Sequence, residues 1–90
     1  MVKYQVVFRP RAVRDFDKLD QMVADRLLKK LRWLAENLDS IRPETLSGPL
    51  SGLFKLRVGD YRVIYEVSHD KGVVTVRLVG HRREIYDLPA

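Results

Sequence analysis

Hydrophobic and polar residues alternate most regularly over residues 53–65, on both sides of a glycine–aspartate pair at positions 59–60. Alternation with a period of two is typical of a strand with one buried face, and a Gly-Asp pair between two such runs predicts a two-residue hairpin turn with glycine at its first position. This turn sets the register and places Arg57 directly opposite Arg62. One face of the hairpin is then apolar, and Lys55, Arg57 and Arg62 share the other face.

The residues before this hairpin predict one strand and two helices. Residues 2–8 alternate as a strand, and Pro10 suits the first turn of a helix that ends near Leu19. Residues 21–38 repeat leucines at spacings of three and four, which is the pattern of a helix with one buried face. Asp20 is a candidate N-cap, because its carboxylate can accept from the first helical amides. The short join indicates that the two helices lie side by side as a helical hairpin.

Two further segments complete the chain. Residues 39–52 are rich in proline and glycine and are predicted to be a linker. Residues 72–80 alternate as a third strand beyond this linker, with Leu78 among the residues expected on the core side. The order β-α-α-β-β-β predicts an α+β fold over a single domain, 1–90. We expect an antiparallel meander sheet with the helical hairpin packed on one face and an open basic face on the other.

Charge and composition indicate a class of partner. The 90 residues contain 17 lysines and arginines against 12 aspartates and glutamates, which gives a net charge of +5 and favours phosphate-bearing partners. The absence of cysteine excludes a disulfide framework and thiolate chemistry. No signal peptide is visible and no apolar run approaches the ~20 residues that a membrane span needs, so we expect a cytoplasmic protein without a membrane partner.

The basic face of the hairpin is the strongest candidate site. Two arginines directly opposite each other repel, and an exposed sheet face usually mixes charges of both signs, whereas Glu66 is the one acid that alternation places here. We therefore expect an anion to bind there, because the arginine fork donates two parallel bonds to a phosphate and keeps its charge. The alternative is an ordinary solvated surface.

Arg82 and Tyr86 follow the last strand and extend this candidate site. Strict alternation would aim Arg82 at the core, and a bulge or strand end at Gly80 would redirect it. Tyr86 is either part of the site or a half-buried aromatic of the tail. Trp33, on the polar side of the long helix, is either an edge-packed aromatic or a docking point for a protein partner.

These residue types suit the cleavage of RNA better than other chemistry. Cysteine, paired carboxylates and a glycine-rich loop are missing from the pattern, and His69 and His81 lie twelve residues apart without a clustered carboxylate. We therefore expect neither a metal site nor a cofactor. RNA cleavage needs no external nucleophile, because the neighbouring 2′-hydroxyl attacks the phosphorus. Lysine, arginine, histidine and tyrosine can neutralise the phosphate, move protons and stack on bases without a metal.

Two stretches of the chain resemble the RelE/ParE toxin superfamily of toxin–antitoxin systems. The resemblance is carried by residues 46–65, LSGPLSGLFKLRVGDYRVIY, and residues 79–86, VGHRREIY, and the order of elements matches over essentially the whole chain. It implies a RelE-type toxin, a ribosome-dependent endoribonuclease that cleaves mRNA in the ribosomal A site and inhibits translation. By motif, the implied catalytic residues are Lys55, Arg57, Arg62, Arg82 and Tyr86. We expect the RNA to be bound by Lys55, Arg57, Arg62, Arg77, His81 and Arg83.

The resemblance also implies partners. A cognate RelB-like antitoxin would oppose the basic face, the toxin would act on the ribosome and mRNA, and operator DNA would be bound only through the toxin–antitoxin complex. Arg57 stands where some relatives have lysine, so the general base is open, and His81 resembles a histidine that some relatives use. The alternatives are a ParE-like toxin that inhibits DNA gyrase by protein contact and a non-catalytic binding module. The joint presence of the basic and aromatic set favours the nuclease.

Overall fold

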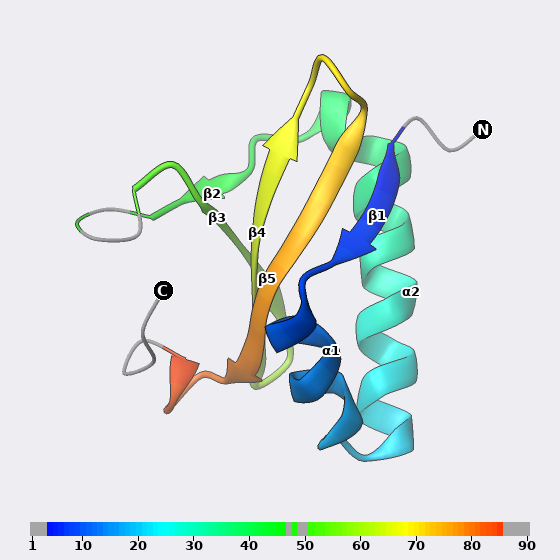
Figure 1. Cartoon of the computed structure of the whole chain (residues 1–90), viewed down its shortest axis with the longest axis vertical. Helices are drawn as coiled ribbons and strands as arrows, with labels where there is room; N and C mark the ends of the chain where they lie inside the picture. The colour runs from blue at the N-terminus through cyan, green and yellow to red at the C-terminus, as the bar shows by residue number, and fades with distance from the viewer. Residues whose placement is uncertain (1–3, 47, 49–50, 86–90) are drawn as a thin grey trace.

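Two helices cover one face of a five-stranded mixed sheet (Figure 1). This computed structural model describes residues 4–46, 48 and 51–85. The predicted α+β fold, with a helical hairpin on one face of the sheet, is confirmed. The elements of the described residues are, in order, β1 (Gln5–Phe8), α1 (Pro10–Asp17), α2 (Gln21–Asn37), the 3-10 turn η1 (Leu38–Ser40), β2 (Glu44–Thr45), β3 (Phe54–Val58), β4 (Tyr61–Ser68) and β5 (Val73–His81).

The strands are arranged in the order β1-β5-β4-β3-β2. The meander of β3, β4 and β5 is antiparallel, as predicted. At one edge β1 pairs parallel with β5, and the chain between them passes through both helices, since a parallel pair cannot be joined by a tight turn. At the other edge β2 pairs antiparallel with β3. The prediction that residues 39–52 form only a linker was therefore wrong at Glu44–Thr45, where two residues add an edge strand to β3.

The central hairpin has the predicted register. Gly59 has a φ of +59°, and no residue of the described part other than glycine has a positive φ. The turn is therefore of type II′, in which only the first central residue has a positive φ, a conformation that glycine adopts without strain. The opposed pairs of β3 and β4 are Phe54–Tyr65, Lys55–Ile64, Leu56–Val63, Arg57–Arg62 and Val58–Tyr61.

A β-bulge in β5 changes which of its residues face the helices. Ile64 lies opposite Leu78, but the next residue, Tyr65, lies opposite Val76, so that Arg77 is the extra residue. Side chains beyond the bulge are shifted by one position relative to the pleat. Leu78 therefore lies on the face away from the helices, and the prediction that it faces the main core was wrong.

Hydrophobic side chains pack on both faces of the sheet. On the helix side, the buried leucines of α2 pack against valines of β3, β4 and β5 and form the main core. On the other side lies a smaller group, the second cluster, formed by Ile64, Leu78 and Ile85, with Leu46 and Leu53 packed against it. This face is therefore not fully open: apolar side chains and the segment after β5 cover part of it.

The join between α1 and α2 is short, as predicted, but it is not capped as predicted. Asp20 occupies the N-cap position of α2, and its carboxylate makes no hydrogen bond to the helix, so the predicted capping role was wrong. Its backbone carbonyl instead accepts the hydrogen bond of the Ala24 amide at 2.9 Å, which is the first bond of the helix. Neither helix in the described part of the chain is long and apolar enough to cross a membrane.

Candidate functional site

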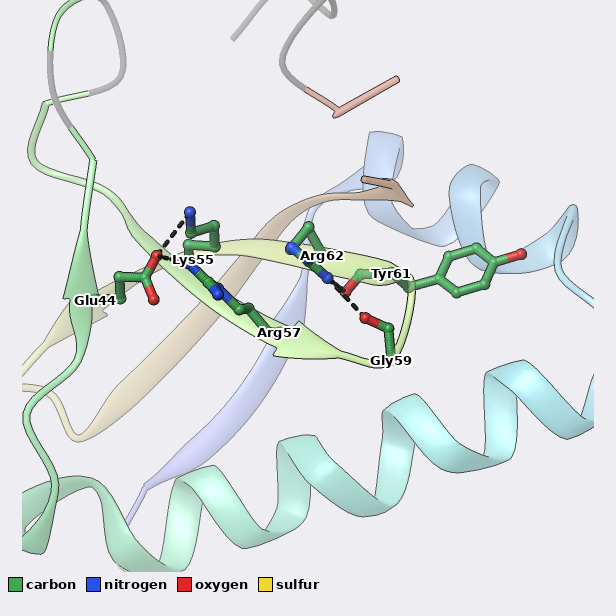
Figure 2. A network of polar contacts seen from close by, with 6 residues as sticks. All are labelled: Glu44, Lys55, Arg57, Gly59, Tyr61 and Arg62. Carbon is green, nitrogen blue, oxygen red and sulfur yellow. Dashed lines mark hydrogen bonds and ion pairs between the residues drawn. The ribbon is translucent and has the colours of Figure 1, made fainter. Parts of the chain in front are cut away.

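Lys55 and Arg57 of β3 and Arg62 of β4 lie on the sheet face away from the helices (Figure 2). The register of the hairpin brings them together, because directly opposed residues share a face and so do residues two apart on one strand. Their environments differ: the Lys55 side chain is 14% exposed and that of Arg57 is 62% exposed. We call these three residues the basic face.

Glu44 of β2 is a residue of this face that the sequence analysis missed. It lies opposite Lys55 in the β2–β3 pairing. Its Oε2 atom accepts from Lys55 Nζ at 2.6 Å and lies 3.2 Å from Arg57 Nη2 (Figure 2). The hydrogen bond from Lys55, followed by that from Arg57, lowers the pKa of Glu44 below its usual value, although partial burial opposes this shift. Glu44 is therefore an ionised carboxylate that lies between two of the predicted site cations.

Arg62 is held by its own turn. Its Nη1 atom donates to the carbonyl oxygens of Gly59 and Tyr61, both at 2.9 Å (Figure 2). The two opposed arginines thus have different partners, since Arg57 pairs with Glu44 and Arg62 pairs with turn carbonyls. This explains how the chain tolerates the repulsion that the sequence predicted, without an external anion.

Arg82 lies beside the same turn. Its backbone amide donates to the Asp60 carbonyl at 2.7 Å, and its Nε lies 3.7 Å from Asp60 Oδ1, with the side chain 54% exposed. Gly80 is regularly paired with Arg62, so no bulge lies there, but β5 does end one residue later, at His81, as the alternative of a strand end predicted. The register shift occurs three residues earlier, at the bulge residue Arg77. It turns the Arg82 side chain away from the core face without any special backbone geometry at Gly80.

His81 lies on the helix side of the sheet, away from the basic face. It pairs with Tyr61, and the two rings meet edge to face with centroids 5.6 Å apart. Its Nδ1 accepts from the Arg83 amide at 3.2 Å, which places the proton of the neutral ring on Nε2. The ring lines a cavity of about 380 Å³ beside α1, together with Arg11 and Lys18.

The remaining predicted site residues are divided between the basic face and the tail. Arg77 contacts Glu66 at 3.2 Å on the side of the basic face, as alternation of Glu66 predicted. Arg83 is exposed in the turn after β5. Tyr86 lies outside the described residues. The structure thus brings Lys55, Arg57, Arg62 and Arg77 to one face, with Arg82 at its end, and separates His81 from them.

The chemistry of the basic face suits an oxyanion. Arginine and lysine side chains donate charge-assisted hydrogen bonds to phosphate oxygens, and the second cluster gives them an apolar neighbour that strengthens such bonds. No group of three histidine, aspartate or glutamate side chains gathers within the described residues.

Comparison with known sequences identifies relatives over nearly the full chain. The family model for the ParE toxin of the type II toxin–antitoxin system parDE matches residues 6–86. A RelE-like toxin protein of Escherichia coli is 31% identical over 94 residues, which cover 97% of this chain and 94% of the relative. The mRNA interferase toxin RelE of Escherichia coli K12 is 38% identical over 90 residues, which cover 92% and 90% of the two chains.

Solved structures show the same fold. The toxin–antitoxin complex RelBE2 from Mycobacterium tuberculosis contains a chain that superposes with a TM-score of 0.81 at 29% identity, covering 91% of this chain and 94% of the other. The isolated RelE toxin of Escherichia coli superposes with a TM-score of 0.69 at 32% identity, covering 93% and 92%. An archaeal RelE–RelB complex from Pyrococcus horikoshii gives 0.71 at 25% identity, covering 89% and 96%.

Proposed function

Because the chain belongs to the RelE/ParE superfamily of toxins of type II toxin–antitoxin systems, we propose that it is a ribosome-dependent endoribonuclease that cleaves mRNA in the ribosomal A site. The observation that carries the proposal is the gathering of Lys55, Arg57 and Arg62 on one sheet face. Arg82 lies beside the turn that also binds Arg62. Relatives named mRNA interferases support the nuclease over other activities of this superfamily.

The reaction needs little from the protein beyond positioning and charge. The 2′-oxygen of one nucleotide forms a bond to the adjacent phosphorus while the bond to the 5′-oxygen of the next nucleotide breaks. The 2′-hydroxyl loses a proton and the leaving 5′-oxygen gains one, so the products are a 2′,3′-cyclic phosphate and a 5′-hydroxyl. Negative charge grows on the phosphate oxygens in the transition state, where fixed cations stabilise it more than they stabilise the ground state.

The basic residues take these roles without a metal ion in our proposal. Lys55 and Arg57 bind the non-bridging phosphate oxygens, since their nitrogen atoms already converge on one carboxylate oxygen. Arg62 and Arg82 act from the turn side on the growing charge. Tyr86 stacks on a base of the mRNA. Arg77 and Arg83 contact the RNA backbone. His81 lies on the helix side of the sheet, so it contacts the RNA only if the RNA bends around the end of β5.

A cognate RelB-like antitoxin is the proposed protein partner. Similar solved structures are RelB–RelE complexes of bacterial and archaeal origin. We propose that the antitoxin opposes the basic face with acidic or amphipathic segments, and that operator DNA is bound only by the complex. The ribosome and its mRNA are the targets of the free toxin.

Mapping of mRNA 5′ ends on translating ribosomes tests the proposed activity. The chain, its Arg82→Ala variant and the matched control Arg14→Ala are each induced in cells, since Arg14 is an exposed arginine on α1, remote from the basic face. We expect codon-phased cuts with the parent and the control, and a loss of about 10²–10³-fold with Arg82→Ala, as for removal of one donor to a developing oxyanion.

The matching family model favours one second candidate, because it describes ParE toxins. A ParE-like toxin would inhibit DNA gyrase by protein contact. Intact mRNA together with gyrase-linked DNA breaks after induction would refute the nuclease and support this alternative.

A further inference from the structure

Glu44 occupies the position in which the basic face would hold a phosphate oxygen. Its Oε2 atom accepts hydrogen bonds from Lys55 Nζ at 2.6 Å and from Arg57 Nη2 at 3.2 Å. A non-bridging phosphate oxygen accepts charge-assisted hydrogen bonds at similar distances. Glu44 and a substrate phosphate therefore cannot both take the same hydrogens of Lys55 and Arg57.

The segment that carries Glu44 is weakly attached to the sheet. β2 contains two residues, and only Glu44 and Thr45 pair with β3. One further backbone bond, from the Leu46 amide to the Leu53 carbonyl at 3.1 Å, closes the loop behind it. The Glu44 side chain is 44% exposed, so its displacement from the cations exposes the carboxylate to water rather than burying it. Short edge pairings of this kind open at low cost compared with the central strands.

We propose that Glu44 is an internal competitor for phosphate, whose carboxylate fills the anion position of Lys55 and Arg57 in the free protein and leaves it when a nucleic-acid backbone binds. The assignment of the ligand as RNA rests on the proposed function, whereas the competition itself rests on the ion pairs of Glu44. Glu44 is thus a residue that sets how tightly the basic face binds its substrate.

Removing the charge of Glu44 should tighten binding. Two unit charges about 4 Å apart in water interact with an energy that corresponds to roughly a fivefold change in binding affinity. The Glu44→Gln variant should therefore bind a single-stranded oligonucleotide about fivefold more tightly at low salt. It should also show a steeper salt dependence, because up to one further phosphate is neutralised by protein cations.

The test measures binding without cleavage. A fluorescent ten-nucleotide single-stranded DNA, which lacks the 2′-hydroxyl, is titrated with the purified full chain, and anisotropy is followed at several salt concentrations. Glu44→Gln and Glu44→Ala remove the charge, whereas Glu44→Asp keeps it and should bind within about twofold of the parent. Glu36→Gln is the matched control, since it removes the same charge from an exposed carboxylate of α2, on the other side of the sheet.

Tighter binding by Glu44→Gln and Glu44→Ala, with a smaller gain for Glu36→Gln, supports the competition. Equal or weaker binding by both Glu44 variants overturns it, and so does an equal gain for Glu36→Gln, which would indicate a general effect of net charge. Thermal unfolding of each variant shows whether it is folded. Using both Glu44→Gln and Glu44→Ala keeps the test valid if one of them does not fold. Mapping of mRNA cuts in cells tests the proposed nuclease separately, and intact mRNA would refute it whatever the oligonucleotide binding shows.

Discussion

Replacing Ile85 by alanine tests whether the second cluster anchors the segment after β5. Ile85 has no exposed surface, and it packs with Ile64 and Leu78 on the face that also carries Lys55. This contact joins the end of the described chain to the sheet. Its loss should therefore lower both the stability of the fold and the order of the segment that contains Arg82.

The size of the effect follows from the carbon atoms removed. Isoleucine exceeds alanine by three carbon groups, and each buried group contributes roughly 0.8 kcal/mol, which gives about 2.4 kcal/mol. The remaining cavity adds to this loss, but a segment near the chain end can collapse into part of the space. We expect the free energy of unfolding to fall by about 3 kcal/mol and Tm to fall by roughly 12–24 °C, since about 1 kcal/mol shifts Tm by 4–8 °C in a domain of this size.

Thermal unfolding followed by circular dichroism measures this change. Met22→Ala is the control, because Met22 is an apolar residue of α2 that is 71% exposed, and its truncation should leave Tm within about 3 °C of the parent. If Ile85→Ala behaves like Met22→Ala, the second cluster does not hold the segment, and the face it covers is open. Mapping of mRNA cuts at 25 °C, where the variant remains folded, should show reduced cleavage, because Arg82 loses its fixed position beside the turn.

Three further changes probe other parts of the fold. Burial raises the pKa of Tyr65 to about 12, so the folded chain keeps a proton that the unfolded chain releases above pH 10, and stability should fall by roughly 2–3 kcal/mol between pH 10 and pH 12. Urea unfolding of Tyr65→Phe should lack this part of the alkaline loss, and an identical pH profile would contradict the assignment. Asp15→Ala removes the Oδ2 atom that accepts from the Val79 amide at 3.0 Å, and calorimetry should show a loss of about 1–3 kcal/mol. Gly80→Ala places a new Cβ 3.1 Å from Ile85 Cδ1, so it should lower Tm in the parent and lower it less in the Ile85→Ala background. Equal Tm shifts in both backgrounds would exclude this coupling.

The hairpin could be predicted from local sequence alone. Alternation over residues 53–65 gave the strands, and a single glycine–aspartate pair gave the turn and every opposed pair of β3 and β4. Such features depend on neighbours within a few residues, so no distant part of the chain is needed to deduce them. The opposed Arg57 and Arg62 belong to this class.

The sequence signal for the bulge at Arg77 is weaker. Consecutive apolar residues, Leu78 and Val79 in β5 and Val63 to Tyr65 in β4, depart from strict alternation and indicate burial on both faces. The alternation of residues 72–80 hid this signal, because it fits the first half of the strand. The position of the bulge is decided by the need to bury Tyr65 and Val76 on one face and Ile64 and Leu78 on the other, which depends on the tertiary packing.

The sequence carries no pattern that would place Glu44 in the site. A strand of two residues is too short for any periodicity, and it lies between proline and glycine residues that favour a loop. Its place is set by pairing with β3, a contact between segments that only the fold brings together. The missed carboxylate changes the electrostatics of the basic face, since it contacts two of its three cations.

The bulge and Glu44 are linked by the burial of Lys55. The β3–β4 register places Ile64, which has no exposed surface, directly opposite Lys55, and the bulge brings Leu78 to the same face. The ammonium group therefore belongs to a side chain that is 14% exposed and has an apolar neighbour. A cation in such a place loses hydration and gains more from an anion than it would in open water. Glu44 supplies that anion in the free protein, and a phosphate that replaces it meets the same favourable surroundings, so the second cluster strengthens the site whichever anion is bound.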